Sequence, residues 1–147
     1  MILWRLSAHK DLQGTGGLNY PGRWHHAGRP IVYLADHPAS CMLEALVHLE
    51  CTNLPETFTL LKVEVPDNVV QALDLSALHE AWVGDQALTQ RIGSGWLAAA
   101  PSVALQIPSA IVPEGKNTLL NPLHPAAVQC RIVDAMSASW DKRLRPN

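Results

Sequence analysis

The stretch GRWHHAGRPIVYLADHPASCMLEALVHL, residues 22–49, decides the fold because a strand pattern in it is followed at once by a helix pattern. Residues 31–35 are β-branched at their start and come directly after a proline, which predicts a short strand. Pro38 suits the first position of a helix, because its missing N–H would have no helical partner there. Residues 38–50 are therefore predicted to be helical.

The predicted helix, capped by Asp36 or His37, has one apolar face made of Ala39, Met42, Leu43 and Leu46. At about 100° per residue, Glu44 lies about 140° round from Ala39, just beyond the edge of that stripe. Taken alone, Tyr33 on the strand is typical of a core aromatic, and Glu44 is typical of a solvated helix position. From its place on the helix, Glu44 could sit at the rim of a cleft.

The rest of the chain has the pattern of short strands with one more helix. Strands are predicted at residues 1–6, 57–65, 69–73, 103–107 and 127–134. A helix is predicted at residues 86–99, weakened by Gly93 and Gly95 at about 1 kcal/mol each. Loops are predicted at residues 14–24 and 109–125, where glycine and proline recur. Elements that do not alternate regularly indicate an α+β fold, and 147 residues fit one compact domain, residues 1–147.

Composition narrows the class of protein. Hydrophobic residues make up 48% of the chain and charged residues 16%, which favours a folded domain over a disordered one. The formal net charge of -2 argues against direct nucleic-acid binding. Three cysteines without regular spacing suit a reducing cytoplasm better than a disulfide framework. The apolar start is interrupted at Trp4 and Arg5, so neither a signal peptide nor a membrane span is predicted.

Two groups of residues resemble known kinds of site but have simpler explanations. The glycines of GTGG, residues 14–17, could cradle a phosphate, yet no Walker motif or immediate helix accompanies them, so a surface loop is favoured. Zinc could be held by His25, His26, His37 and Cys41. No second ligand pair at metal spacing accompanies them, so ordinary polar histidines are favoured and no metal site is predicted.

Nucleophilic catalysis by serine or cysteine has little support. The chain has no GxSxG elbow for a serine nucleophile. Cys41 falls in the first helical turn, where a thiol pKa could be lowered, although a small buried hydrophobe is the more typical state.

Arg5 lies in an apolar strand and would need an anionic partner if it were buried. Ser109 follows Pro108 and could be a turn residue.

The order of these segments along the chain carries more information than any one of them. The chain contains, in this order, MILWRLS, GTGGLNYPGRWHHAGRPIVYLA, ASCMLEALVHLE and IPSAIVPEGKNTLLNPLHP. This series strongly resembles the RES-domain family, the toxins of bacterial Xre-RES toxin-antitoxin pairs, named for a characteristic arginine, glutamate and serine. The resemblance runs from Trp4 to about Pro125. One departure is Thr118, where many relatives have an aromatic residue.

The resemblance implies a compact fold similar to that of ADP-ribosyltransferases, with NAD⁺ as a substrate and no separate cofactor. It implies a catalytic role for Arg5 of the WR motif, Glu44 of the helix and Ser109 of the PSA turn. It implies NAD⁺ binding by Arg23 of GRW, Tyr33 of the YLA strand and Asn121 of the NP motif. It also implies an Xre-like antitoxin that covers the active site and carries the DNA-binding part, and a toxin homodimer within a larger complex.

The chemistry of NAD⁺ cleavage suits these residue types. Breaking the nicotinamide-ribose bond releases a neutral pyridine, so no general acid is needed. A carboxylate such as Glu44 can stabilise the oxocarbenium ion that develops on the ribose. The predicted function is therefore a cytoplasmic toxin that degrades NAD⁺, with water or phosphate as the acceptor. The alternatives are ADP-ribosylation of a cellular protein, a non-enzymatic interaction module and, third, a histidine-based metal hydrolase.

Overall fold

The computed structural model describes residues 1–49 and 54–144. Within them, the strands are β1 (Ile2–Ser7), β2 (Val32–Ala35), β3 (Thr57–Glu64), β4 (Val70–Ala72), β5 (Ala104–Pro108), β6 (Lys116–Leu120) and β7 (Arg131–Ser139). The α-helices are α1 (Gly16–Asn19), α2 (Pro38–His48) and α3 (Gln86–Ala99). Short 3-10 helices occupy the connections: η2 (Asp67–Val69), η3 (Leu75–Ala77), η4 (Trp82–Gly84), η5 (Pro125–Gln129) and η6 (Lys142–Leu144). The predicted α+β class is confirmed.

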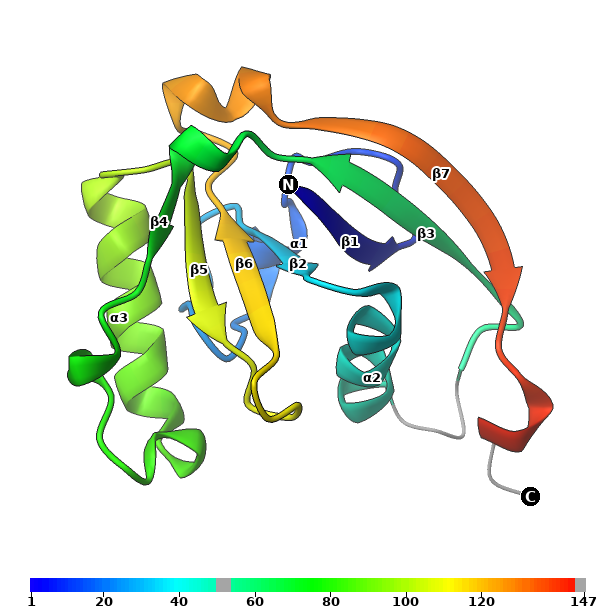
Figure 1. Ribbon diagram of the computed structural model, residues 1–147, viewed down its shortest axis with the longest axis horizontal. Helices are drawn as coiled ribbons and strands as arrows, with labels where there is room; N and C mark the ends of the chain where they lie inside the picture. The colour runs from blue at the N-terminus through cyan, green and yellow to red at the C-terminus, as the bar shows by residue number, and fades with distance from the viewer. Residues whose placement is uncertain (50–53, 145–147) are drawn as a thin grey trace.

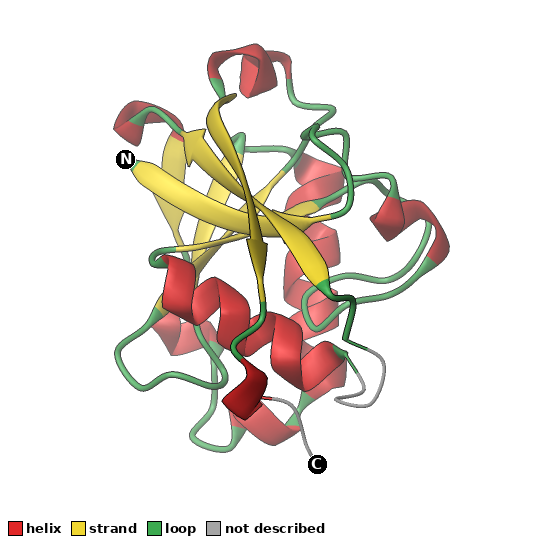
Figure 2. Cartoon of the chain, turned by 90° about the vertical axis from the view of Figure 1, so that its right-hand side faces the viewer, coloured by secondary structure: helices red, strands yellow, loops and turns green. Residues whose placement is uncertain are grey.

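All the strands belong to one seven-stranded sheet with the order β4-β5-β6-β2-β1-β3-β7. Neighbouring strands are antiparallel, except for the parallel pair β4 and β5. In Figure 1, α3 lies beside β4 and β5 at one end of the sheet, and β7 runs along the other end. Figure 2 shows the strands crossing one another in the upper half of the view, as in a twisted sheet.

The two central strands pair at a single position. β1 and β2 are matched only at Trp4 and Ala35, whereas β1 and β3 are matched at each residue from Ile2 to Ser7. The sheet therefore consists of two well-paired halves, β4-β5-β6-β2 and β1-β3-β7, that are joined by one residue pair. A gap in strand pairing at this point leaves room between the halves for side chains and for a ligand.

The sheet separates two buried clusters, because successive residues of a strand point to opposite faces. Leu34 and Leu120 belong to one cluster, which also includes residues of β1, β3 and β5. Leu119 belongs to the other cluster, with Trp24 and the α3 residue Trp96, and Tyr33 packs against it. The register of β2 and β6 thus places Tyr33 and Leu119 on the face that is covered by α3.

Helix α2 begins as predicted, but its buried residue lies outside the predicted apolar face. The His37 ring accepts a hydrogen bond from the N–H of Ala39 at 3.1 Å, so His37 is the cap. The buried residue of the helix is Cys41, while Leu43 is 45% exposed and Val47 is 61% exposed. The helix contacts β1 and β2. In the predicted apolar face, Ala39 and Leu43 are exposed, whereas Met42 and Leu46 are half-buried. The predicted last residue, Glu50, lies outside the described residues.

The clearest other differences from the prediction concern three segments. Residues 16–19 form a helical turn, α1, inside the predicted glycine-rich loop, and the turn ends just before Pro21. Residues 116–120, predicted as loop, form the central strand β6 because both of its edges pair, with β2 and with β5. The last strand starts at Arg131 because Pro125 opens the 3-10 helix η5 before it.

Helix α3 has the predicted bounds and binds the loop that precedes β2. Its polar side chains reach the backbone of residues 22–26 by three hydrogen bonds. These join Thr89 Oγ1 to the carbonyl of Arg23 at 2.6 Å, Gln90 Nε2 to the carbonyl of Gly22 at 2.9 Å, and the N–H of His26 to Ser94 Oγ at 2.9 Å. The loop is therefore fixed against one face of α3. None of the helices in the described parts of the chain is long and apolar enough to span a membrane.

Because that loop lies so close to α3, we expect substitution of the two glycines of α3 to have opposite effects on stability. A Cβ on Gly93 would overlap the carbonyl of Trp24, whereas a Cβ on Gly95 would meet nothing within 4 Å. We expect Gly93→Ala to lower the free energy of unfolding by at least about 2 kcal/mol, because overlap in a packed region forces the backbone apart. The matched control Gly95→Ala should raise it by up to about 1 kcal/mol, because alanine favours helix. Urea titration of both variants measures the difference, and equal effects would contradict this packing.

Candidate active site

A cleft of about 480 Å³ opens where β1 and β2 diverge. Its walls come from Arg5 and Leu6 of β1, from residues 33–35 of β2, from α2, and from the glycine-rich segment with the loop that α3 holds. The volume falls within the range of about 300–1,000 Å³ that is typical of small-molecule sites. The single pairing of Trp4 with Ala35 and the packing of α2 on both strands therefore create the cleft.

Glu44 is held in place at this cleft by two hydrogen bonds to one carboxylate oxygen. Ser109 Oγ donates to Glu44 Oε1 at 3.2 Å, and Asn117 Nδ2 donates to the same oxygen at 2.7 Å. Glu44 is half-buried, and its Oε2 has no hydrogen-bond partner among the described residues. A carboxylate fixed through one oxygen in this way keeps the other oxygen available to a bound molecule.

The two donors come from segments far from α2 in the sequence. Ser109 follows β5, and its Oγ also accepts from the backbone N–H groups of Ile111 and Val112 at 3.1 and 3.0 Å. Asn117 lies on β6 opposite Ala35 of β2, and its Oδ1 is buried without a hydrogen-bond partner in the described part of the chain. The structure thus brings Ser109 to Glu44 and adds Asn117, which sequence reasoning did not select.

Arg5 extends from β1 along one wall of the cleft. Its Nη1 donates to the carbonyl of Asp11 at 3.1 Å, and no carboxylate among the described residues forms an ion pair with it. Burial lowers the pKa of the guanidinium, and the charge of Asp11 partly opposes this. Arginine stays charged in proteins, so Arg5 is a positive charge that is available to an anion in the cleft.

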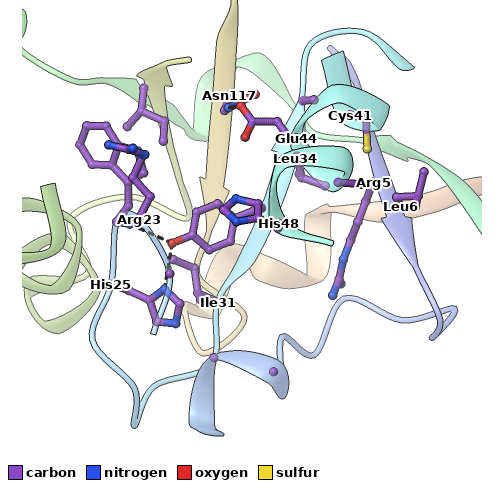
Figure 3. Close-up of a pocket in the computed structure, with 18 of the residues that line it drawn as sticks. Arg5, Leu6, Arg23, His25, Ile31, Leu34, Cys41, Glu44, His48 and Asn117 are labelled. Carbon is purple, nitrogen blue, oxygen red and sulfur yellow. Dashed lines mark hydrogen bonds between the residues drawn. The ribbon is translucent and has the colours of Figure 1, made fainter. Parts of the chain in front are cut away.

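Arg23 reaches the cleft from the opposite side. Its Nη1 donates to the carbonyl of Val83 in η4 at 2.9 Å, and the ring of the next residue, Trp24, packs on Trp82 of η4 with 5.9 Å between centroids. Figure 3 shows Arg5 and Arg23 on opposite sides of the view, with Glu44 between them. A bound molecule that spans the cleft would therefore meet one cation near each end.

Tyr33 forms part of the cleft wall between the arginines. Its hydroxyl accepts a hydrogen bond from the N–H of Trp24 at 3.1 Å and lies 2.8 Å from Nδ1 of His25. Burial raises the pKa of Tyr33 well above its ordinary value, so the phenol stays protonated. Tyr33 is half-buried and also lines the cleft. It therefore has both the core contact and the cleft contact that were predicted for it.

Comparisons with known proteins place this architecture in a family. The sequence profile of the RES domain matches residues 2–141. Toxin Res of Pseudomonas putida is 49% identical over 134 residues, which cover 90% of this chain and 92% of that protein. The chain belongs to the RES-domain family. The prediction of a RES-domain toxin is thereby confirmed.

Two further comparisons concern activity and fold. The Prs ADP-ribosylating toxin of Sphingobium sp. is 38% identical and covers 91% of this chain and 86% of that protein. The M. tuberculosis toxin in the MbcT-MbcA toxin-antitoxin complex superposes with a TM-score of 0.77, at 21% identity, over 94% of this chain and 84% of that one. The RES-domain chain thus shares the fold of that toxin.

Two positions singled out by the sequence lie away from the cleft of the RES domain. Asn121 is 4% exposed, its Nδ2 lies 3.5 Å from the carbonyl of Leu97, and it lines a separate cavity of about 160 Å³. Thr118 is 1% exposed and points to the face opposite Asn117. Neither residue lines the large cleft. The structure therefore does not bring Asn121, which was predicted to bind NAD⁺, to the other site residues.

The position of Cys41 in the first helical turn suggested a lowered thiol pKa, but the structure indicates a raised one. Burial raises the pKa of Cys41 to about 11, with opposition from Arg5 and reinforcement from Glu44. The structure records Cys41 as a buried free thiol, as it does Cys130. Cys41 therefore contacts the cleft as a small apolar group. Within residues 1–49 and 54–144, no three histidine, cysteine or acidic residues are grouped so as to hold a metal ion.

This protonated thiol should react slowly. With its pKa near 11, about one Cys41 in a thousand is ionised at pH 8, against about one in four for an ordinary cysteine. We expect iodoacetamide to modify Cys41 in the folded protein at least about 100-fold more slowly than in urea. Peptide mass spectrometry over a time course measures both rates. Rapid modification of the folded protein at neutral pH would show a thiolate and contradict the assignment.

Proposed function

We propose that this RES-domain chain is a toxin that cleaves the bond between nicotinamide and ribose in NAD⁺, with water or phosphate as the acceptor. The observation that carries the proposal is the tethering of Glu44 by Ser109 and Asn117 at the centre of a cleft with an arginine on each side. The 38% identity to a relative named an ADP-ribosylating toxin supports an enzyme that acts on NAD⁺, since ADP-ribosylation also breaks the nicotinamide-ribose bond.

The leaving group explains why one carboxylate suffices. Nicotinamide departs from the pyridinium as a neutral base, so no side chain has to donate a proton to it. Positive charge develops instead on the ribose, and Glu44 can stabilise it through its unbonded Oε2. Because Ser109 and Asn117 already hold Oε1, the carboxylate needs little reorganisation as the charge appears.

The charges of the cleft suit the rest of the dinucleotide. The pyrophosphate carries negative charge, and the guanidinium groups of Arg5 and Arg23 are planar donors that match phosphate oxygens. The glycines at 16, 17 and 22 line the cleft near these groups and allow a ligand to approach the backbone closely. Tyr33 supplies an aromatic ring between the arginines for the nicotinamide.

The partners and compartment follow from this function. An antitoxin would have to block the cleft, and the solved neighbour is itself part of a toxin-antitoxin complex, which supports such a partner here. We propose an Xre-like antitoxin that supplies the DNA-binding part, since the net charge of this chain is -2. A toxin homodimer within that complex and a cytoplasmic location, where NAD⁺ is abundant, complete the proposal.

A second candidate function is transfer of ADP-ribose to a protein. It is favoured by the 38% identity to a relative that is named an ADP-ribosylating toxin. The same contacts would bind NAD⁺ in both reactions, and only the acceptor would differ. Incubation of the purified chain with phosphate, a cell extract as the source of acceptor proteins, and NAD⁺ labelled in its adenylate part separates them. Hydrolysis yields free ADP-ribose, phosphorolysis yields phosphorylated ADP-ribose, and transfer yields a labelled protein band.

Replacement of the carboxylate gives the most direct test. Glu44→Gln keeps the acceptor oxygen for Ser109 and Asn117 but removes the negative charge, so we expect NAD⁺ cleavage to fall by at least about 1,000-fold with the fold intact. Induction of the unaltered chain should deplete total cellular NAD within minutes, and the variant should not. A folded Glu44→Gln protein with normal turnover would refute the proposed function.

Asn117 gives a second test with a neighbour as the control. We expect Asn117→Ala to lower kcat/KM for NAD⁺ by at least about tenfold, because Glu44 loses its shorter hydrogen bond at 2.7 Å. Thr118→Val, which changes the next residue on the opposite face, should keep near-normal turnover. Thermal melting of both variants shows whether they are folded. Equal activity of the folded variants would mean that Asn117 does not position Glu44.

A further inference from the structure

His25 is a buried histidine at the cleft that has no role in the proposed chemistry so far. It is 3% exposed, yet it lines the cleft, and its Nδ1 lies 2.8 Å from the hydroxyl of Tyr33. Its Nε2 has no hydrogen-bond partner among the described residues. A buried polar side chain with an unsatisfied atom is costly to keep, which indicates that its other contact matters.

The hydrogen bonds around Tyr33 limit where its hydroxyl proton can go. The N–H of Trp24 can only donate, so the oxygen of Tyr33 accepts there at 3.1 Å. The hydroxyl proton of Tyr33 is then free to be donated to Nδ1 of His25 in the tautomer whose Nδ1 is unprotonated. In that tautomer His25 is neutral and carries its own proton on Nε2. The chain of contacts runs from Trp24 through Tyr33 to His25 in one direction.

The surroundings of His25 keep this arrangement neutral. Burial lowers the pKa of the imidazole, the nearby charge of His26 lowers it further, and the carbonyls of Tyr20 and Gly17 partly oppose both effects. A neutral ring is the state in which Nδ1 can accept a proton. Protonation of Nδ1 would turn this acceptor into a donor, so the Tyr33 hydroxyl could no longer donate to it.

The glycine at position 22 allows the two rings to meet. A Cβ on Gly22 would lie 2.6 Å from the hydroxyl of Tyr33 and 2.9 Å from Nδ1 of His25, too close for either atom. The rings lie 5.7 Å apart at their centroids with a tilt of 52°. Figure 3 shows His25 at the same side of the cleft as Arg23, where the dashed lines converge on a hydroxyl oxygen.

We propose that His25 is a positioning residue for substrate binding: by accepting the Tyr33 hydroxyl proton, it fixes the Tyr33 ring against the wall of the cleft where the nicotinamide would pack. The inference rests on the proposed function, because it assigns the Tyr33 ring to NAD⁺. In this role, the effect of His25 on binding acts through the hydroxyl of Tyr33, which a purely structural role would not require.

The test measures NAD⁺ affinity without turnover. Isothermal titration calorimetry of NAD⁺ into the Glu44→Gln protein gives the reference Kd, and the same protein then carries His25→Ala, Tyr33→Phe or both. We expect each single change to weaken binding about tenfold, the size of one lost hydrogen bond, and the double change to weaken it no further than about twofold beyond the larger single effect. Additive losses, or unchanged binding in His25→Ala, would overturn the proposal.

Conservative replacements separate positioning from packing. Asparagine places its amide oxygen near the position of Nδ1, whereas glutamine places it nearer that of Nε2. His25→Asn should therefore bind NAD⁺ within about threefold of the reference, and His25→Gln should resemble His25→Ala. This comparison also decides the matter if His25→Ala does not fold. An Asn variant as weak as the Gln variant, at equal melting temperatures, would contradict the proposal.

The proton on His25 can be observed independently of NAD⁺. Nitrogen-15 NMR of the imidazole at neutral pH should show the tautomer protonated at Nε2, and Tyr33→Phe should disturb the Nδ1 signal. The opposite tautomer would overturn the inference while leaving NAD⁺ cleavage untouched. If the Glu44→Gln reference does not bind NAD⁺ and the unaltered chain does not consume it, the proposed function itself fails, and the inference falls with it.

Discussion

The site depends on the break in strand pairing between β1 and β2. If these strands paired along their length, side chains at Arg5 and Tyr33 would project from a continuous sheet and no cleft would separate them. They pair only at Trp4 and Ala35, and α2 packs on both strands beside that point. The cost of the unpaired backbone is offset elsewhere, since β1 is fully paired with β3 and β2 with β6. An open cleft is thus built into a stable sheet.

Each wall of the cleft is then held by contacts that come from distant parts of the chain. Helix α3 fixes the loop of Arg23 by side-chain hydrogen bonds to its backbone and by the close fit at Gly93. On the other wall, Ser109 and Asn117 hold Glu44. Residues of the cleft are therefore held in place by hydrogen bonds from other segments of the chain, which is the arrangement that preorganised sites require.

The sequence predicted more of the elements than of their environment. The bounds of α3 and the start of α2 follow from capping and proline signals that act within a few residues. Strand β6 was missed because its pattern is weak, and pairing with β2 and β5 decides it. The apolar face predicted for α2 is only partly buried, and Cys41 outside it is the buried residue, because the strands that the helix meets decide which side is covered.

By itself, the sequence determined the α+β class, the family and five residues, Arg5, Arg23, Tyr33, Glu44 and Ser109, that line or border one cleft. Only the tertiary structure showed that Asn117 bonds to Glu44, that His25 bonds to Tyr33 and that Asn121 lies elsewhere. The physical reason is range: capping, proline and glycine effects act between neighbours along the chain. Strand register and helix packing join residues that are far apart in sequence, and no local pattern specifies those pairs.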